Sequence, residues 1–290
     1  MKAKDSKEII GSLMLLITAI IWGFAFVAQQ VGGAICGPFT FNAVRFVIGG
    51  LVLLPLLLIQ KRTITKEALI GGILCGICLF AGSALQQIGL QSSTAGKAGF
   101  ITALYVILVP LTGLFLGKRI PGRNWFCAIL ALIGLFLLCV SSDFTIQTGD
   151  IWLFACAFVF TAHILVIDYY SAKADGVVIS CLQFFVAGIL STSFAVPMES
   201  TSFREILSSW MPILYTGVLS CGVAYTLQVV FQKNVKPSRA SILLSLESVF
   251  ATTGGWMLLG QAMTWKELLG CVLMFSATIL SLVGKKESNF

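Results

Sequence analysis

The sequence predicts an all-α membrane protein with ten transmembrane helices in two inverted five-helix repeats, and three observations lead to that fold class. The first is composition: 58% of the 290 residues are hydrophobic and only 11% are charged, whereas a soluble domain carries about 25% charged residues. The second is a series of ten long apolar runs, and the third is internal similarity at a fixed spacing. Together they exclude a soluble globular domain.

Each apolar run approaches the length of about 20 residues that an α-helix needs to cross about 30 Å of hydrocarbon. The first run follows a basic segment, as in a signal peptide, but it is too long for one and is expected to be the first span. Short connections predict one compact bundle without soluble domains. The predicted helices cover residues 11–31, 39–59, 67–90, 95–117, 122–140, 149–169, 176–197, 211–231, 238–260 and 266–284.

Lysine and arginine residues predict the orientation of these spans. With the N-terminus inside, 15 of the 19 Lys and Arg residues fall on the cytoplasmic side, three fall outside and Arg45 lies within a span. This bias predicts that both termini are cytoplasmic, an N-in/C-in topology. The formal charge of +7 is distributed over short clusters between spans, so it forms no basic patch that could bind nucleic acid.

The two halves of the chain resemble each other at an offset of 142 in sequence number, or 138 in the earlier part of each half. This similarity predicts a tandem duplication, with helices 1–5 in residues 1–145 and helices 6–10 in residues 146–290. Because each repeat has an odd number of spans, the second repeat must be inverted relative to the first. The matched residues include Gln86 with Gln228, Lys97 with Arg239, Leu104 with Leu246, Gly113 with Gly255 and Phe46 with Phe184.

Inverted repeats are typical of many secondary transporters, because two equivalent halves that exchange conformations open a central site first to one side and then to the other. Three segments also carry a family resemblance: Thr94–Arg119, the run Trp22-Gly23-Phe24-Ala25, and Leu246-Glu247-Ser248-Val249-Phe250-Ala251 with Leu259-Gly260. With the duplicated layout, they resemble the drug/metabolite transporter (DMT) superfamily, EamA-type branch. The resemblance implies a ten-helix exporter or exchanger of small metabolites that does not hydrolyse ATP.

Four ionisable residues are candidates for substrate binding or coupling. Lys97 begins the fourth predicted helix on the outer side, and Arg239 begins the ninth on the inner side. Each could attract a carboxylate or phosphate of the substrate or guard one mouth of the path. The alternative for each is that its side chain extends to the lipid headgroups. Glu247 lies about 12 Å inside the ninth helix and His163 about 9 Å inside the sixth. Both could bind a coupling proton, and hydrogen bonding to a neighbouring helix is the alternative for each.

Four uncharged residues complete the candidate set. Gln86 and Gln228 are suited to orienting a substrate near the midplane, or to joining helices by hydrogen bonds. Trp22 and Tyr105 lie too deep for the aromatic belts of a membrane protein and could form a wall of the site or pack in the core. Arg45, about 9 Å from the outer end of the second helix, is expected to extend to the headgroups and ranks below these candidates.

The sequence therefore predicts a secondary active transporter, an exporter of small metabolites such as amino acids, which acts across the plasma membrane by alternating access. An obligate exchanger of anionic or phosphorylated metabolites is the alternative within transport. A membrane-embedded enzyme is the alternative outside it, but no clustered catalytic residues occur, so no enzyme activity is predicted. The sequence G-x-x-x-x-G-K-[ST] is absent, which argues against a nucleotide-driven pump.

No cofactor or metal is predicted, because Cys75 and Cys78 have metal-ligand spacing without a second pair or a nearby histidine. The expected partners are a small-molecule substrate, protons as the candidate coupling ion, and the lipid bilayer. Nucleic acid is not an expected partner. Substrate identity, transport direction, stoichiometry and oligomeric state, a homodimer included, are left open by the sequence.

Overall fold

The computed structural model describes residues 2–117, 119–139, 147–260 and 263–283, and within these ranges the chain forms helices and no strands. Eight of the helices described are long and apolar enough to cross a membrane, and Gly122–Leu137 is a shorter apolar helix. The chain is therefore an all-helical, multi-pass membrane protein. The predicted repeat boundary at residues 145 and 146 and the predicted helix ends at 140 and 284 lie partly or wholly outside the described residues.

Most helices follow the predicted runs closely, but the first helix extends well beyond its predicted range of 11–31 at both ends. The first group is α1 (Lys2–Cys36), α2 (Pro38–Ile59), α3 (Lys66–Leu90), α4 (Ala95–Thr102), α5 (Tyr105–Phe115) and α6 (Gly122–Cys139). The second is α7 (Thr148–Ser171), α8 (Gly176–Met198), α9 (Phe203–Ser208), α10 (Trp210–Leu214), the π-helix η1 (Tyr215–Tyr225), α11 (Thr226–Phe231), the 3₁₀ turn η2 (Gln232–Asn234), α12 (Pro237–Leu244), α13 (Glu247–Leu259) and α14 (Trp265–Val283). Three predicted spans are thus built from more than one helical piece.

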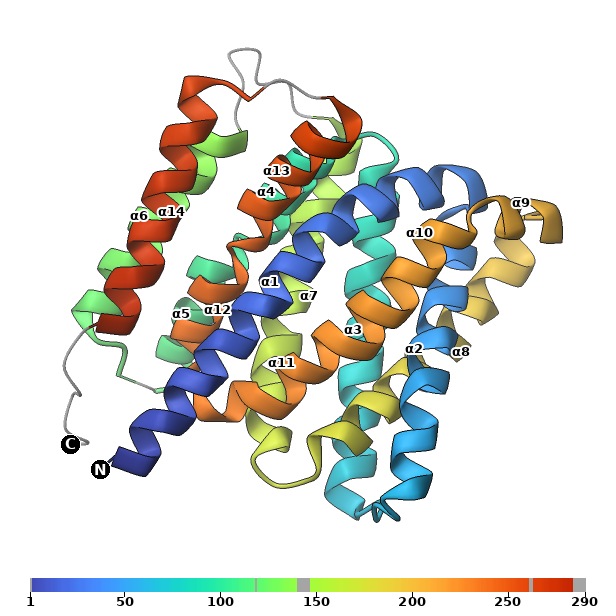
Figure 1. Ribbon diagram of the computed structural model, residues 1–290, viewed down its shortest axis with the longest axis horizontal. Helices are drawn as coiled ribbons and strands as arrows, with labels where there is room; N and C mark the ends of the chain where they lie inside the picture. The colour runs from blue at the N-terminus through green and yellow to red at the C-terminus, as the bar shows by residue number, and fades with distance from the viewer. Residues whose placement is uncertain (1, 118, 140–146, 261–262, 284–290) are drawn as a thin grey trace.

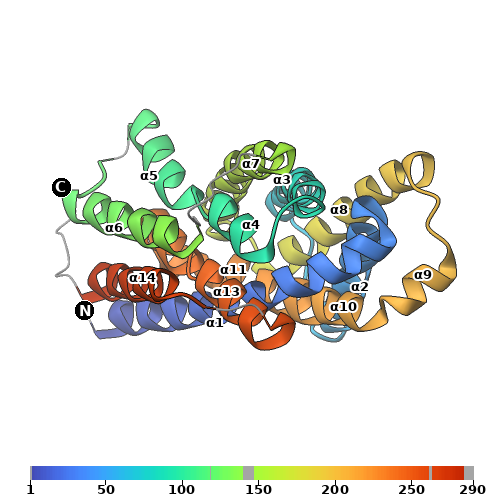
Figure 2. The ribbon, with the colours of Figure 1, turned by 90° about the horizontal axis from the view of Figure 1, so that it is seen from above.

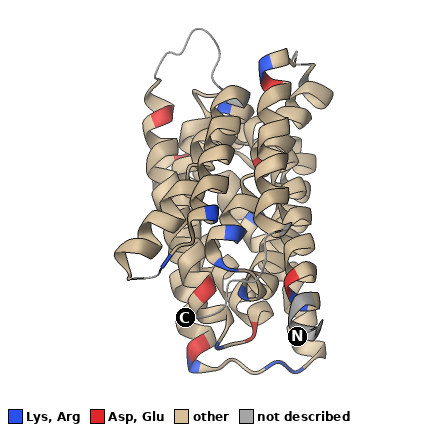
Figure 3. Ribbon diagram, turned by 90° about the vertical axis from the view of Figure 1, so that its left-hand side faces the viewer, with Lys and Arg blue, Asp and Glu red and all other residues tan. Residues whose placement is uncertain are grey.

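The helices form a bundle in which α6 and α14 lie at one edge and α2 and α8 at the opposite edge, as both views show (Figures 1 and 2). Between these edges α1 crosses the bundle, with α3 and α7 packed side by side (Figure 1). Large apolar side chains are exposed on the outside of the bundle, including Phe115 and Trp265. Such a surface suits hydrocarbon rather than water. Charged residues are sparse along the ribbon (Figure 3).

Two predicted spans are each broken into two helices at equivalent positions. The first break separates α4 from α5 at Ala103 and Leu104, and the second separates α12 from α13 at Ser245 and Leu246. In both breaks the leucine amide bonds the carbonyl three residues back, at 3.2 Å and 3.3 Å respectively. A tighter, 3₁₀-type bond of this kind shifts the helix axis and frees nearby backbone groups. Since 246 − 104 = 142, the breaks coincide with the offset of the sequence similarity.

The proline of the span 95–117, Pro110, does not mark the break in that span. Pro110 lies inside α5, and the interruption lies earlier, at Ala103 and Leu104. Proline removes one backbone donor, but the neighbouring bonds of a buried helix can be kept when packing supports them. The break is made instead by the 3₁₀-type turn that precedes Tyr105.

The π-helix η1 packs against α1 through side-chain hydrogen bonds to its backbone. The hydroxyl of Thr18 donates to the Ala224 carbonyl oxygen at 3.1 Å, and the indole Nε1 of Trp22 donates to the Ser220 carbonyl oxygen at 3.4 Å. A π-helix leaves carbonyl groups out of regular register, so they need such partners. These bonds fix Trp22 beside the centre of the bundle.

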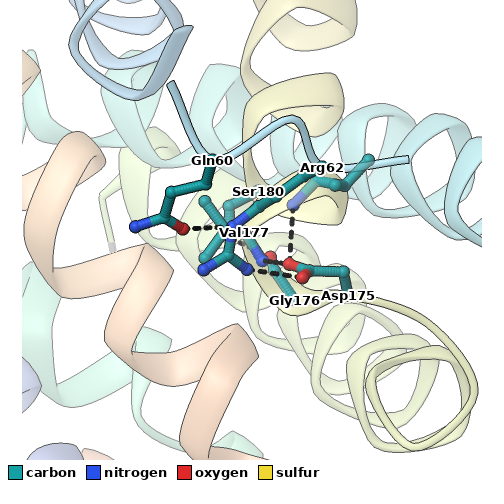
Figure 4. Close-up of polar contacts among 7 residues, drawn as sticks. Gln60, Arg62, Asp175, Gly176, Val177 and Ser180 are labelled. Carbon is teal, nitrogen blue, oxygen red and sulfur yellow. Dashed lines mark hydrogen bonds and ion pairs between the residues drawn. The ribbon is translucent and has the colours of Figure 1, made fainter. Parts of the chain in front are cut away.

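The edge helices α2 and α8 are joined at one end by an arginine–carboxylate contact. Arg62, just after α2, pairs with Asp175, which caps the start of α8 by accepting from the Val177 amide at 2.8 Å (Figure 4). Arg62 Nε also donates to Gln60 Oε1 at 2.6 Å. Arg62 is therefore held by Gln60 at the end of α2 and by Asp175 at the start of α8.

The other ends of α2 and α8 are joined by Glu199, which follows α8. Its carboxylate accepts from the backbone amides of Phe39 and Thr40 at 2.8 and 2.7 Å, and from the Thr40 hydroxyl at 2.6 Å. A carboxylate at a helix N-terminus satisfies free amides and matches the positive end of the helix dipole. With contacts at both ends, α2 and α8 form a firmly joined pair.

Candidate functional site

A cavity lies in the centre of the bundle, where the two helix breaks meet α1, α2, α3, α7 and η1. Its volume is about 30 Å³, which is room for about two water molecules. The lining residues are Trp22, Phe26, Gln29, Arg45, Gln86, Thr102, Tyr105, Phe160, His163, Ile164, Ser220, Tyr225, Gln228, Leu244 and Glu247. Six of the eight candidate residues predicted from the sequence are among them.

The two halves meet in the cavity through Tyr105 and Glu247. The Tyr105 hydroxyl donates to Glu247 Oε1 at 2.8 Å, and both side chains are buried. Tyr105 is the first residue of α5 and Glu247 the first residue of α13, so each lies directly after a helix break. The breaks therefore position a phenol and a carboxyl group face to face in the middle of the bundle.

His163 and Trp22 line the cavity on either side of Tyr225. The Nε2 atom of His163 lies 3.1 Å from Gln183 Oε1, and its ring meets the Tyr225 ring edge-on at a centroid distance of 6.0 Å. Trp22 packs against the same tyrosine at 4.4 Å. The three rings form an aromatic wall on the cavity. Tyr225 was not among the sequence candidates.

The amides Gln86 and Gln228 both line the cavity. Gln86 Nε2 donates to the Thr102 hydroxyl at 3.4 Å, and Gln228 Nε2 donates to Gln232 Oε1 at 3.0 Å. Gln228 Oε1 has no hydrogen-bond partner among the described residues. This carbonyl oxygen is available as an acceptor for a ligand.

Arg45 was expected to extend to the lipid headgroups, and this expectation is wrong. Its side chain is only 2% exposed and lines the cavity. Asn42 Oδ1 accepts from its Nε at 2.9 Å, and its guanidinium lies 4.8 Å from the centre of the Phe46 ring. The Nη2 atom has no partner among the residues described. Asn42, one turn before Arg45, was the available signal, because it can hold the guanidinium inside the bundle.

Lys97 and Arg239 do not line the cavity; each forms an ion pair at an end of the bundle. Lys97 Nζ lies 2.6 Å from Asp150 Oδ2, and Arg239 pairs with Glu8. The pairs lie near opposite ends of α1: Glu8 is in its first turns, whereas Lys97 shares a cavity with Gly33. The stretch of α1 from Glu8 to Gly33 spans about 38 Å of helix.

The two ion pairs share a numerical spacing in the sequence. Arg239 and Lys97 differ by 142 in sequence number, and Asp150 and Glu8 differ by the same amount. Each pair joins a residue of the first half to a residue of the second. The earlier part of each half matches at an offset of 138, however, so the sequence similarity does not match Glu8 with Asp150 and does not identify them as the partners.

The central cavity thus presents one arginine and one carboxyl group, together with amides and an aromatic wall. No ion pair between Arg45 and Glu247 occurs in the part of the chain that the structure describes. The same residues contain no cluster of His, Cys, Asp or Glu that could hold a metal ion. The chemistry that the site offers is recognition of a small polar molecule by charge, hydrogen bonds and ring contacts.

The comparison with protein families agrees with this arrangement. The model of the EamA-like transporter family matches residues 9–140 and again residues 147–283. The chain belongs to the EamA-like transporter family. Its resemblance to the DMT superfamily is thereby confirmed, and it is a membrane transporter.

Similar proteins extend over nearly the whole chain. An uncharacterized transporter of Archaeoglobus fulgidus is 34% identical, covering 96% of this chain and 87% of that protein. The threonine/homoserine exporter RhtA of Escherichia coli is 24% identical, covering 96% of this chain and 92% of RhtA. A solved crystal structure superposes with a TM-score of 0.79 at 19% identity, over 93% of this chain and 96% of the other, which shows that the fold is shared.

Proposed function

We propose that this transporter is a secondary active exporter of small zwitterionic metabolites, such as amino acids, across the plasma membrane. In this proposal ten spans form two inverted five-helix repeats, residues 1–145 and 146–290, with both termini in the cytoplasm. The equivalent helix breaks at Leu104 and Leu246 support the two-repeat arrangement. The export of threonine and homoserine by RhtA supports the substrate class and direction.

The observation that carries the substrate class is that the cavity holds Arg45 and Glu247, both buried and without an ion pair to each other among the residues described. Two opposite charges in one buried site are costly unless each finds a partner. A zwitterion supplies both partners at once: its carboxylate pairs with Arg45 and its ammonium group with Glu247. Gln228 Oε1 adds an acceptor for the ammonium group.

The size of the cavity implies that the described conformation is contracted. A volume of about 30 Å³ holds water but no amino acid. Substrate entry therefore requires the two halves to move apart at Tyr105 and Glu247, where one hydrogen bond joins them. An ammonium group that replaces the Tyr105 hydroxyl as the partner of Glu247 would favour that movement.

The ion pairs at the two ends act as gates in this proposal. Lys97 with Asp150 closes one end, and Arg239 with Glu8 closes the other. In the contracted conformation both pairs are formed. Opening one pair at a time gives access to the cavity from one side at a time, which is the requirement of alternating access.

Proton coupling is assigned in this proposal to Glu247 or His163. Both lie in the cavity and each has a single hydrogen-bond partner among the described side chains, Tyr105 and Gln183 respectively. Protonation of Glu247 would remove the charge that holds the ammonium group and release it. An exchanger of anionic metabolites is disfavoured, because Lys97 and Arg239 are already paired with carboxylates away from the cavity.

The test is transport by purified protein in proteoliposomes. Labelled L-threonine is measured against glycerol 3-phosphate, with and without a pH gradient. Arg45→Gln and Glu247→Gln should each reduce kcat/KM for threonine by about 10- to 150-fold, the equivalent of a charged hydrogen bond worth about 1.5–3 kcal/mol. The exposed residues Arg204 and Glu67 supply charge-matched controls, Arg204→Gln and Glu67→Gln, which should transport normally. Transport of glycerol 3-phosphate but not threonine would refute the proposal.

A further inference from the structure

A second polar cavity lies at the end of the bundle where α1 and α3 finish and α4 begins. We call it the vestibule; its volume is about 360 Å³. Unlike the central cavity, it has room for a small metabolite in the described conformation. Its polar lining includes Gln30, Gln87, Gln91, Ser92, Ser93 and Lys97. The proposed transport mechanism uses only Lys97 of this set.

The side chain of Gln87 links the lining of the vestibule to the lining of the central cavity. Gln87 lines the vestibule and is buried, and its Nε2 donates to the backbone oxygen of Gln29 at 2.8 Å. Gln29 lines the central cavity. A Cβ atom on Gly33 would lie 1.6 Å from Gln87 Nε2, so the Gln87 side chain packs directly on α1 at Gly33 and would have to shift if this residue were larger. The linings of the two cavities are therefore in direct contact.

The vestibule has a negative side and a positive side. The last turns of α1 and α3 contribute Ala34 and Leu90 to it, and helix C-termini carry partial negative charge. The Oε1 atoms of Gln30 and Gln87 are buried there without a hydrogen-bond partner among the described residues. These groups accept hydrogen bonds, so they suit an ammonium group.

The positive side is the start of α4. Thr94 caps this helix by accepting from the Lys97 amide at 3.3 Å, and a helix N-terminus carries partial positive charge. Lys97 Nζ lies on the same side and pairs with Asp150. A carboxylate placed here would share Lys97 with Asp150. The ligand that satisfies both sides is a small molecule with one carboxylate and one ammonium group.

We infer that the vestibule is a second binding site for a small zwitterion, with the carboxylate at Lys97 and the start of α4, and the ammonium group at the oxygens of Gln30 and Gln87. The ligand class follows from the vestibule's own charges and does not depend on the central cavity. Occupation weakens the pair between Lys97 and Asp150, because the two carboxylates compete for one ammonium group. The site thereby couples ligand binding at this end to opening of the adjacent gate.

The test is protection of a cysteine placed in the vestibule. Gln91 is exposed and lines it, so purified Gln91→Cys protein in nanodiscs is treated with a polar maleimide, and modification of that peptide is followed by mass spectrometry. L-Threonine should slow the reaction about tenfold at ten times its half-protecting concentration. Removing either charge from the ligand, as in 3-hydroxybutyrate or 1-aminopropan-2-ol, should abolish protection at that concentration. Ser208→Cys, at an exposed position outside the vestibule lining, is the control and should not be protected.

Two further variants separate this inference from the proposed transport function. Protection should persist when Glu247→Gln removes the charge of the central site, and it should be lost in Lys97→Met and in Gln30→Leu, which alter opposite sides of the vestibule. Loss of protection in Glu247→Gln would mean that Gln91→Cys reports only the central cavity, and would overturn the inference. Protection by either singly charged analogue as strong as that by threonine would also overturn it. Transport could fail in Glu247→Gln while vestibule protection remains, so the two proposals are judged by different readouts.

Discussion

Neutralising one gate carboxylate should open the cavity from one end only. In Asp150→Asn the side chain loses the charge that pairs with Lys97 at 2.6 Å, while the backbone contact from the Gln147 amide at 2.8 Å can be kept by an amide oxygen. In Glu8→Gln the equivalent contact with Arg239 is lost at the other end. Each substitution should favour the conformation open at its own end.

The size of this effect can be placed between two limits. Exposed ion pairs contribute about 0–1 kcal/mol, whereas breaking a buried pair costs about 3–5 kcal/mol. The side chains of Lys97 and Asp150 are 18% and 9% exposed, so an intermediate value of about 2 kcal/mol is expected. Because about 1.4 kcal/mol corresponds to a factor of ten, the ratio of open to closed protein should rise about 30-fold.

The assay is thiol modification of Ser220→Cys, because Ser220 lines the central cavity and is buried. With an impermeant reagent and vesicles of each orientation, Asp150→Asn should raise the modification rate about 30-fold from one side, and Glu8→Gln should do so from the other. The charge exchange Lys97→Asp with Asp150→Lys should restore the slow rate. Arg62→Gln is the matched control: it breaks an ion pair of the joined α2–α8 edge, so it should lower stability without raising the rate. Equal increases from both sides in Asp150→Asn would refute the gating mechanism.

Two further predictions concern stability, measured as the melting temperature in detergent. Gly23→Ala should lower the melting temperature, because the new Cβ would lie 2.2 Å from Phe250 Cβ and overpacking costs about 1–3 kcal/mol. The control is Gly122→Ala, which should leave the melting temperature unchanged because no atom lies within 4 Å of the new Cβ. Equal effects of the two substitutions would contradict the close packing at Gly23. Glu199→Ala should lower the free energy of unfolding by about 0.5–2 kcal/mol, because α2 loses its cap. The amide and the hydroxyl of Thr40 both donate to the Glu199 carboxylate. An unchanged melting temperature would show that Glu199 does not hold α2 to α8.

The sequence was informative about the spans and about depth in the membrane. Apolar runs located most helices to within a few residues, because hydrocarbon imposes both length and composition on a span; α1 extends further because the helix continues beyond its apolar run. Polar residues far from span ends led to Glu247, His163, Gln86 and Gln228, which the structure brings together at one cavity. The physical reason is that polar groups deep in a bundle are costly unless they face one another or a cavity.

The sequence was less informative where packing decides the direction of a side chain or the position of a helix break. Arg45 is close enough to a helix end to reach the headgroups, and only the inward contact with Asn42 shows that it does not. The breaks at Ala103 and Ser245 involve residues with no strong helix-breaking tendency, whereas Pro110, the obvious breaker, lies within α5. The ion-pair partners Asp150 and Glu8 lie 53 and 231 residues from their basic partners, so no local pattern reveals them.

The contact between Tyr105 and Glu247 has a consequence for how two similar halves can differ. The two residues are 142 positions apart, so in the proposed duplication they occupy the same place in each half. Had both halves kept glutamate there, two carboxylates would face each other in a buried site and could not both be ionised. Had both kept tyrosine, the centre would hold no acid. Divergence at this one position leaves one carboxyl group at the contact between the halves, and exchanging the two residues should preserve the bond while moving the acid to the other half.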